Sequence, residues 1–258
     1  LDLYTYVMDW EAFKEVQVSF LKSSTTDCEI PTDHAINATL LNLANKFKVR
    51  YIINGMNFAT EGMSVPAWSY GHSDWRYIKD VMLKNGAKKS SIKKLPHFSL
   101  FKLAYSLLIK RIKIVSILNY IHFDKEEVLK TIIKELDYRP YAQKHYESIY
   151  TRFFQGHFLI EKFNIDKRRG QYSDLIRSKQ ITRENALEMI SKPAYENNNQ
   201  LENDKDFVTK KLGLTKNELN RVLKQKNKNY KDYRNQKQLI YYMKSIYNIL
   251  RKIGIQPK

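Results

Sequence analysis

Three separated stretches of the sequence gather the residue types that bind anions and move protons. The first is "IPTDH" at 30–34, and the second is "GMNFATEG" at 55–62, which combines glycines with an amide, a hydroxyl and a carboxylate. The third is "RPYAQKHYESIYTRFFQGHFLIEKFNIDKRR" at 139–169, the densest polar stretch of the chain. Lysine and arginine can neutralise phosphate and a glutamate can orient them, so this third stretch is suited to a phosphorylated or carboxylated ligand.

Each stretch also has an ordinary structural interpretation. A helix over 144–155 would place Lys144, Glu147 and Arg152 near one face, which describes an anion site or a surface helix with ion pairs. The "DKRR" at 166–169 is an anion clamp or a solvated turn, and 55–62 is a ligand edge or a turn with a helix cap. The backbone amides at a helix start favour anions, yet a lone histidine in such a turn is more often structural.

Cysteine and histidine usage excludes several kinds of site. The single cysteine, Cys28, rules out a disulfide framework and a cysteine zinc site, and it fits a reducing, cytoplasmic location. The six histidines are scattered, with no His-x-x-x-His spacing. Cys28 is interpreted as a small packed residue.

The elements that would position these residues follow an α/β order. We predict a buried strand at 3–8, a helix at 10–22 and a turn at Pro31 with a cap at Thr32 or Asp33. The next helix carries an apolar spacing (Ile36, Leu40, Leu43, Phe47), and a strand follows at 49–54. This order predicts a parallel sheet with crossover helices, in which ligands bind beyond the carboxyl ends of the strands. The polar tip at 55–62 is then the edge of a site.

The rest of the chain reads as helical and polar. We predict a flexible linker at 196–204 and a last helix with an apolar face that begins at Leu239. The expected domains are 1–83, 84–195 and 196–258. The longest apolar run, 98–121, is interrupted by Lys102, Lys110, Arg111 and Lys113, so it is expected to pack within the protein and to contact a membrane at most peripherally.

The net charge of +18 is confined to two segments. Residues 84–113 contain nine Lys/Arg and no acid, and residues 205–258 contain fifteen Lys/Arg against three acids. Lysine outnumbers arginine by 33 to 12, which indicates a lysine-rich composition more than a phosphate-reading surface. Nucleic acid is therefore not the expected partner, and RNA binding remains the alternative.

Together, "DCEIPTDHAINATLLNLANKFKVRYIINGMNFATEG", "KHYESIYTRFFQ" and "FNIDKRR" with "LIRSKQITRENAL" resemble the N-acetyl sugar amidotransferase family, a branch of the N-type ATP pyrophosphatases or PP-loop superfamily. The resemblance covers roughly residues 1–195. It implies a partial parallel-sheet PP-loop α/β domain followed by a mainly helical C-terminal region. It also implies an ATP-dependent conversion of an acetamido group on a nucleotide-linked sugar into an acetamidino group for surface polysaccharides. In this reaction the amide is adenylated, and ammonia from a separate glutaminase displaces AMP.

The resemblance assigns roles by position. Gly55, Asn57, Thr60 and Glu61 would face ATP and Mg²⁺, with Glu61 as the metal contact. Asp33 and His34 would position groups or handle protons beside the reacting amide, and Thr32 would contact the substrate. The residues expected to bind substrate or leaving pyrophosphate are Lys144, His145, Glu147, Arg152, Lys167, Arg168 and Arg169.

Two departures from the family pattern bear on activity. Met56 stands where the family more often has a small residue, and the Ser-Gly-Gly-x-Asp-Ser phosphate loop is absent from these 258 residues. We expect that loop upstream of Leu1, so the chain alone is not expected to catalyse. The alternatives are an RNA-binding, tRNA-modifying PP-loop relative and a non-catalytic fragment that holds sugar nucleotide or docks a glutaminase. The sugar, the glutaminase and the oligomeric state stay open.

Overall fold

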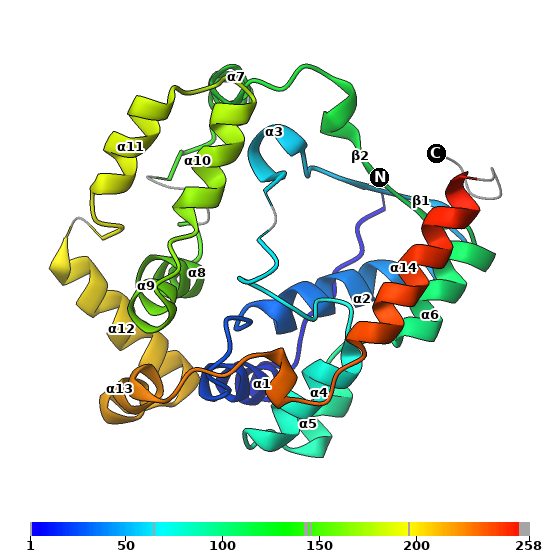
Figure 1. Ribbon diagram of the computed structural model, residues 1–258, viewed down its shortest axis with the longest axis horizontal. Coiled ribbons are helices and arrows are strands. Elements are labelled where there is room, and N and C mark those ends of the chain that lie inside the picture. The colour runs from blue at the N-terminus through cyan, green and yellow to red at the C-terminus, as the bar shows by residue number, and fades with distance from the viewer. Residues whose placement is uncertain (1, 64, 142–143, 145, 196, 253–258) are drawn as a thin grey trace. The chain divides into compact units, whose positions relative to one another are not determined.

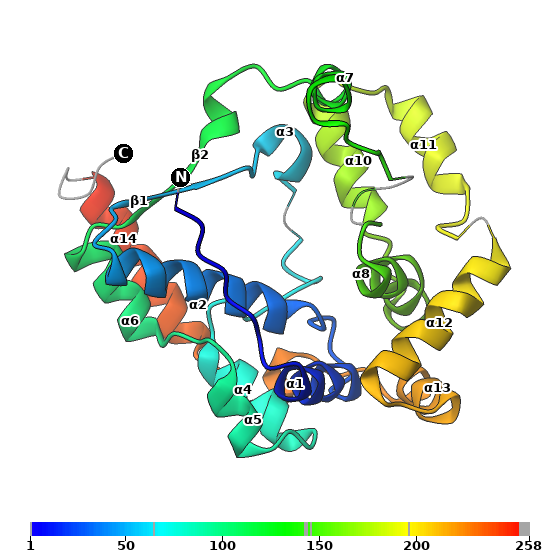
Figure 2. The ribbon, with the colours of Figure 1, turned by 180° about the vertical axis from the view of Figure 1, so that it is seen from behind.

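The computed structural model describes residues 2–63, 65–141, 144, 146–195 and 197–252 (Figures 1 and 2). The chain forms two compact units that interleave along the sequence. Unit 1 consists of Leu1–Ile52, Tyr70–Ile114 and Lys226–Lys258, and unit 2 of Ile53–Ser69 and Val115–Gln225. The predicted domains follow chain order, whereas these units alternate along it, so the domain boundaries stay a prediction.

Unit 1 is organised around helix α1 (Trp10–Lys22), which packs against α4 (Trp75–Lys84) and α5 (Lys89–Lys94). The helix predicted at 10–22 is confirmed, and it begins where the Asp9 side chain accepts a hydrogen bond from the Ala12 amide. Fully buried apolar side chains form the core: Val16, Phe20, Tyr77, Ile78, Val81 and Met82. The other helices of the unit are α2 (Ile30–Lys46), α6 (Leu100–Ala104), the π-helical η1 (Tyr105–Ile109), the short η4 (Tyr230–Asp232) and α14 (Lys237–Lys252).

The segment that follows residue 225 closes unit 1. The Lys228 amide donates to the Ser24 carbonyl (2.8 Å) and the Tyr233 hydroxyl donates to the Ser23 carbonyl (2.9 Å). The Gln236 amide donates to Asp74 Oδ2 (2.6 Å), a carboxylate that also accepts from the Tyr70 hydroxyl. The late segment therefore seals the loop between α1 and α2 and the start of α4.

Helix α2 begins earlier and packs differently than predicted. It starts at Ile30, so Pro31 stands in its first turn and neither Thr32 nor Asp33 caps it. The buried face carries small residues and a histidine (His34, Ala35, Ala38, Leu41, Ala44), whereas Ile36, Leu40 and Phe47 are exposed. Small side chains let the helix approach its neighbours closely. The helix therefore buries the side with the small residues rather than the side with the largest apolar residues.

The strand predicted at 3–8 is wrong. Residues 2–9 run as irregular chain past α2, and Leu3 and Val7 are almost fully exposed (Figure 2). Tyr4 packs edge-on against Phe47, with 6.0 Å between ring centroids. A strand needs a neighbour to satisfy its backbone groups, and none of the described residues pairs with this segment.

The sheet consists of two parallel strands, β1 (Tyr51–Asn54) and β2 (Lys113–Ser116). The strand predicted at 49–54 is thus confirmed with a later start. Strand β2 lies inside the apolar run 98–121, for which the sequence predicted packing within the protein but no strand. The described fold is therefore mainly helical with a small parallel sheet, and the division between the units falls within each strand.

Unit 2 is helical apart from its share of the strands. The long helix at its centre joins α8 (Ile149–Phe153), the π-helical η3 (Phe154–Phe158) and α9 (Leu159–Phe163), with four buried aromatic and aliphatic side chains: Phe153, Phe154, Phe158 and Leu159. The remaining elements are α3 (Phe58–Glu61), η2 (Ile117–Tyr120), α7 (Lys125–Leu136), α10 (Arg168–Arg177), α11 (Arg183–Ser191), α12 (Asn198–Leu212) and α13 (Lys216–Lys224). Within this unit α3 packs against α10, and α12 against α8.

Two segments of unit 2 bear on the sequence predictions. The helix considered for 144–155 begins only at Ile149, where the Ser148 side chain accepts a hydrogen bond from the Thr151 amide and caps it. Most of the predicted linker 196–204 belongs to α12, which Asn197 caps and whose Asp204 is buried. Among the described residues, no helix combines the length and the apolar character needed to span a membrane.

Candidate functional site

The polar turn after β1 is shaped by Asn57. Its buried side chain accepts hydrogen bonds from the Thr60 amide (2.9 Å) and the Thr60 hydroxyl (3.1 Å), which starts helix α3. Two residues predicted to face ATP therefore hold each other in a helix cap. Gly55 is exposed, and apart from its two chain neighbours no atom lies within 4 Å of the place where a Cβ would stand. The turn consequently presents backbone and open space at Gly55.

The end of this turn is anchored by Asp174, which we did not predict. Asp174 lies in α10 and is 2% exposed, and its Oδ2 accepts a hydrogen bond from the Met63 amide (2.8 Å). A Cβ at Gly62 would stand 2.8 Å from the Phe58 carbonyl oxygen and 3.3 Å from Asp174 Oδ1, so only glycine fits. Among the described residues, Oδ1 accepts no hydrogen bond, and Arg177 lies 3.6 Å away. The sequence around Asp174, a single acid within "SDLIRSK", carries no signal for this role.

Lys144 joins two of the predicted motifs. Its Nζ lies 2.8 Å from Glu61 Oε1 and donates to the Thr60 carbonyl (3.2 Å), and both charged side chains are less than a third exposed. The sequence separation of more than 80 residues makes this a tertiary contact. A lysine and a glutamate thus meet at the rim of the turn after β1, where a phosphate could compete for the ammonium group.

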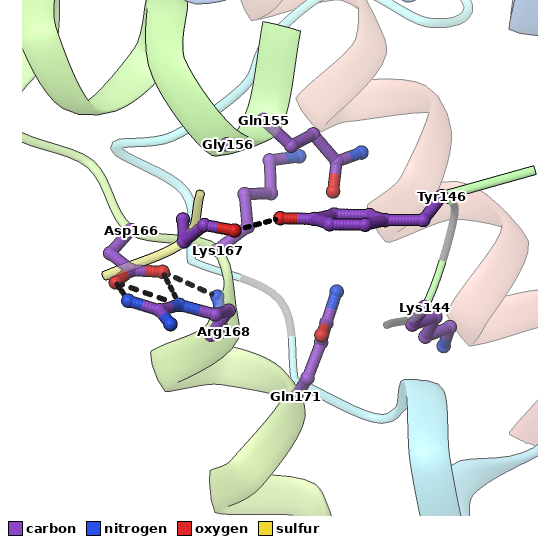
Figure 3. A pocket seen from close by; sticks show the side chains of 9 residues that line it. Lys144, Tyr146, Gln155, Gly156, Asp166, Lys167, Arg168 and Gln171 are labelled. Atoms are coloured by element: carbon purple, nitrogen blue, oxygen red, sulfur yellow. Dashed lines mark hydrogen bonds and ion pairs between the residues drawn. The ribbon is translucent and has the colours of Figure 1, made fainter. Parts of the chain in front are cut away.

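A hollow in unit 2 lies next to this pair (Figure 3). The space between its lining residues, open solvent included, is about 250 Å³. These residues are Lys144, Tyr146, Gln155, Gly156, Asp166, Lys167, Arg168, Gln171 and Ala194. Figure 3 shows the Tyr146 ring extending across it between Gln155 and Gln171. The room for the centre of a water-sized molecule is only about 10 Å³, so the hollow is a shallow surface depression that could hold no more than a small group of a ligand.

Tyr146 is held in place by its hydroxyl group. The hydroxyl donates to the Ala194 carbonyl (2.9 Å), and burial raises the pKa of Tyr146, so the phenol stays protonated. A Cβ at Gly156 would stand 3.0 Å from Tyr195 Cε2 and 3.1 Å from the Tyr146 hydroxyl, so glycine permits both rings to approach the helix. The ring thereby forms a fixed apolar surface within a polar lining.

The cationic side chains that line the hollow differ in how many hydrogen bonds and ion pairs they make with the rest of the chain. Arg168 holds Asp166 in a two-point ion pair (2.7 and 3.1 Å) and donates to the Lys192 carbonyl (2.9 Å). The guanidinium thereby fixes the turn into α10. Lys167 lines the hollow at the start of that helix. Lys144 and Lys167 are therefore the lysines that the hollow offers to an anionic ligand.

Other predicted residues lie elsewhere in unit 2. Arg152 forms a two-point ion pair with Asp204 of α12 (Nε–Oδ2 2.6 Å, Nη2–Oδ1 2.7 Å), and the Tyr195 hydroxyl donates to the same carboxylate (2.7 Å). Glu147 and Arg169 are exposed and do not line the hollow. His145 lies outside the described residues.

Thr32, Asp33 and His34 belong to unit 1. His34 is fully buried, stacked between Trp75 (5.4 Å) and Phe98 (4.4 Å). Its Nδ1 lies 2.8 Å from the His72 carbonyl and its Nε2 accepts from the Phe98 amide (3.4 Å), which fits a neutral ring protonated at Nδ1. Asp33 lies 3.3 Å from the His72 ring, and Thr32 is half-buried. In this arrangement His34 packs the core, and the roles assigned to all three stay predictions.

His34 makes stability depend on pH. Burial lowers its pKa from 6.5 to about 4. Between pH 4 and pH 6.5, therefore, this histidine is protonated in the unfolded chain and neutral in the folded chain. The contribution of His34 to the free energy of unfolding is complete above about pH 6.5 and is lost as the pH falls towards 4. Urea unfolding at pH 5 should therefore give a free energy about 2 kcal/mol lower than at pH 7. His34→Phe should make the free energy of unfolding less dependent on pH, whereas replacing the exposed His122 with glutamine should leave the pH dependence unchanged. The same pH dependence in His34→Phe as in the unaltered chain would contradict this prediction.

The side chains around Glu61 determine how it could hold Mg²⁺. In the described parts of the chain, no group of three or more His, Cys, Asp or Glu side chains comes together. Glu61 supplies one carboxylate beside Lys144. Proteins commonly hold Mg²⁺ through one or two carboxylates and the phosphates of a substrate. The donor set therefore fits a metal that arrives with a nucleotide.

The comparison with protein families bears on the helical part of this site. Residues 147–249 match the family model described as LPS biosynthesis protein WbpG-like, C-terminal domain. The match covers less than half of the chain, and it includes Gln155, the Asp166–Arg168 pair and Gln171 of the hollow. No curated protein and no solved structure matches the chain. The region that builds most of the hollow is thus similar to a domain of lipopolysaccharide biosynthesis proteins.

Proposed function

We propose that the chain is part of an ATP-dependent amidotransferase of lipopolysaccharide or other surface-glycan biosynthesis. The enzyme would convert an acetamido group of a nucleotide-linked sugar into an acetamidino group. The amide oxygen would be adenylated with release of pyrophosphate, and ammonia from a separate glutaminase would displace AMP. The proposal includes a PP-loop fold whose phosphate loop these 258 residues do not contain.

The observation that carries the proposal is the contact between Lys144 and Glu61. It joins the turn after a parallel strand, where nucleotides bind in α/β sheets, to the cationic stretch that precedes α8. The resemblance of residues 147–249 to a lipopolysaccharide biosynthesis domain adds the pathway class. An RNA-binding function has no comparable support among the described contacts.

The chain's own residues would act by binding and orientation. Glu61 would contact Mg²⁺ that arrives with ATP, and the ion would neutralise charge on the phosphates when bound. Lys144 would exchange its contact with Glu61 for one with a phosphate and stabilise charge that develops there. Lys167 would bind a second phosphate or carboxylate, and the Tyr146 ring would stack on an apolar sugar face. Arg168 and Asp166 would keep this lining rigid.

The experiment that tests the proposal has two readouts. Calorimetry measures binding of UDP-linked N-acetyl sugars to the 258-residue chain, and an enzymatic assay measures ammonia-dependent pyrophosphate release by the protein as its gene encodes it. We expect saturable sugar-nucleotide binding and release that requires both sugar and ammonia. The proposal fails if no such sugar binds and the chain instead binds tRNA with a steep dependence on salt.

A further inference from the structure

Helix α14 of unit 1 carries an apolar stripe that faces solvent. Leu239, Tyr242, Ile246 and Ile249 are spaced by three, four and three residues, which places them on one side of the helix. They are 38%, 62%, 54% and 57% exposed. Contiguous apolar surface of this kind marks a contact with another surface, because isolated exposed residues would not align along one side.

The charge of the segment that carries this stripe is of one sign. From residue 233 to 258 the chain contains six Lys/Arg and no acid, and three of the lysines belong to α14: Lys237, Lys244 and Lys252. The helix also carries exposed tyrosines at 241 and 242. Aliphatic residues, tyrosines and lysines on one helix are typical of segments that lie in a membrane interface, where the lysine stems extend to the phosphates.

A second basic apolar surface belongs to the same unit. Phe101, Tyr105 and Ile109 repeat every four residues along α6 and η1, and all three are exposed. Lys110 lies over the Tyr105 ring (5.6 Å), within the acid-free segment 84–113. Figures 1 and 2 show α6 and α14 at the same end of unit 1. Both basic segments of the sequence therefore present apolar side chains in one unit.

These charges select among the possible occupants. A second copy of α14 would bring an acid-free cationic helix against another, which like-charge repulsion opposes. An anionic bilayer supplies both an apolar interior for the stripe and phosphates for the lysines. We propose that unit 1 binds the surface of an anionic membrane through the stripe of α14, with the α6–η1 surface as a second contact. This inference is independent of the proposed function.

Vesicle sedimentation tests the proposal with matched variants. The 258-residue chain is mixed with phosphatidylcholine vesicles, with or without about one third phosphatidylglycerol. We expect binding only to the anionic vesicles and a fall of about tenfold when NaCl is raised from about 0.1 to 0.5 M. Ile246→Glu should lower the partition coefficient by about tenfold or more. Leu187→Glu in α11, where the leucine is 55% exposed, makes the same change of charge and should bind like the unaltered chain.

Three results would overturn the proposal. The first is an unaltered chain that does not bind anionic vesicles but forms a dimer at high protein concentration. If Ile246→Glu dissociates this dimer, the stripe is a self-association face. The second is retention by immobilised polyglutamate without vesicle binding, which indicates an acidic protein partner. The third is equal binding by Ile246→Glu and the unaltered chain, because only charge would then be involved. Circular dichroism of each variant establishes that it is folded.

Discussion

Replacing Arg152 with alanine should lower the free energy of unfolding by about 3–5 kcal/mol. The guanidinium is 17% exposed and the Asp204 carboxylate 5% exposed, and their two-point contact connects α8 to α12. The hydrogen bond to Asp204 raises the pKa of Arg152, which reflects how strongly the pair favours the charged form. Removal of the arginine leaves a buried carboxylate with only the Tyr195 hydroxyl as a described donor. Urea denaturation of the purified variant measures the effect.

The matched control is another short ion pair on the surface. Lys216 and Asp206 lie 2.6 Å apart but are 65% and 55% exposed, so Lys216→Ala should destabilise the protein far less than Arg152→Ala. The double variant Arg152→Met with Asp204→Leu should be more stable than Arg152→Ala, because no unpaired charge stays buried. Equal losses for Arg152→Ala and Lys216→Ala would show that the α8–α12 pair contributes no more than a surface contact.

Replacing Lys144 with alanine should lower the turnover number for ammonia-dependent pyrophosphate release by about a hundredfold or more. The reason is that Lys144 is the cation that touches the turn after β1 and also lines the hollow. Its ammonium group carries a full charge next to the place where negative charge would develop. The measurement is steady-state release with saturating sugar nucleotide, for the protein as its gene encodes it.

Two variants make this result specific. Lys179→Ala removes an exposed lysine just after α10 and should leave turnover unchanged. Glu61→Gln removes the partner of Lys144 and should also impair turnover, since the metal contact is lost. Unchanged turnover in Lys144→Ala would remove Lys144 from the proposed machinery, while sugar-nucleotide binding would still test the proposed function on its own.

The sequence predicted local structure better than packing. Helix α1 and the strand at 49–54 could be read from periodicity and end signals, because both are properties of neighbouring residues. Helix α2 shows where this fails. Its period was correct, but its buried face is built on alanines, and periodicity weighted by size selected Ile36 and Phe47 instead. The strand at 3–8 was predicted from composition alone, and composition does not supply a pairing partner.

The candidate site divides in a similar way. Lys144, Lys167 and Arg168 were identified as a cationic group, and the structure places all three at one hollow. Arg152 belonged to the same sequence pattern but binds Asp204, which lies 52 residues further along the chain. Asp174 could not be identified, since its importance arises from a contact with Met63 across 111 residues. Such partners are determined by tertiary structure and leave no local signal.

The interleaving of the units has a consequence for the order of folding. Residues 115–225 of unit 2 form one continuous stretch, whereas unit 1 needs Lys228, Tyr233 and Gln236 to close the loop after α1 and the start of α4. During synthesis, α1, α2 and α4 of unit 1 therefore emerge before most of unit 2, but their packing is complete only after the segment that follows residue 225 has emerged. The apolar surfaces around α1 and α4 stay open in the meantime. Unit 2 should consequently acquire its core before unit 1, and pausing of the ribosome shortly after residue 225 would leave α1 and α4 accessible to chaperones.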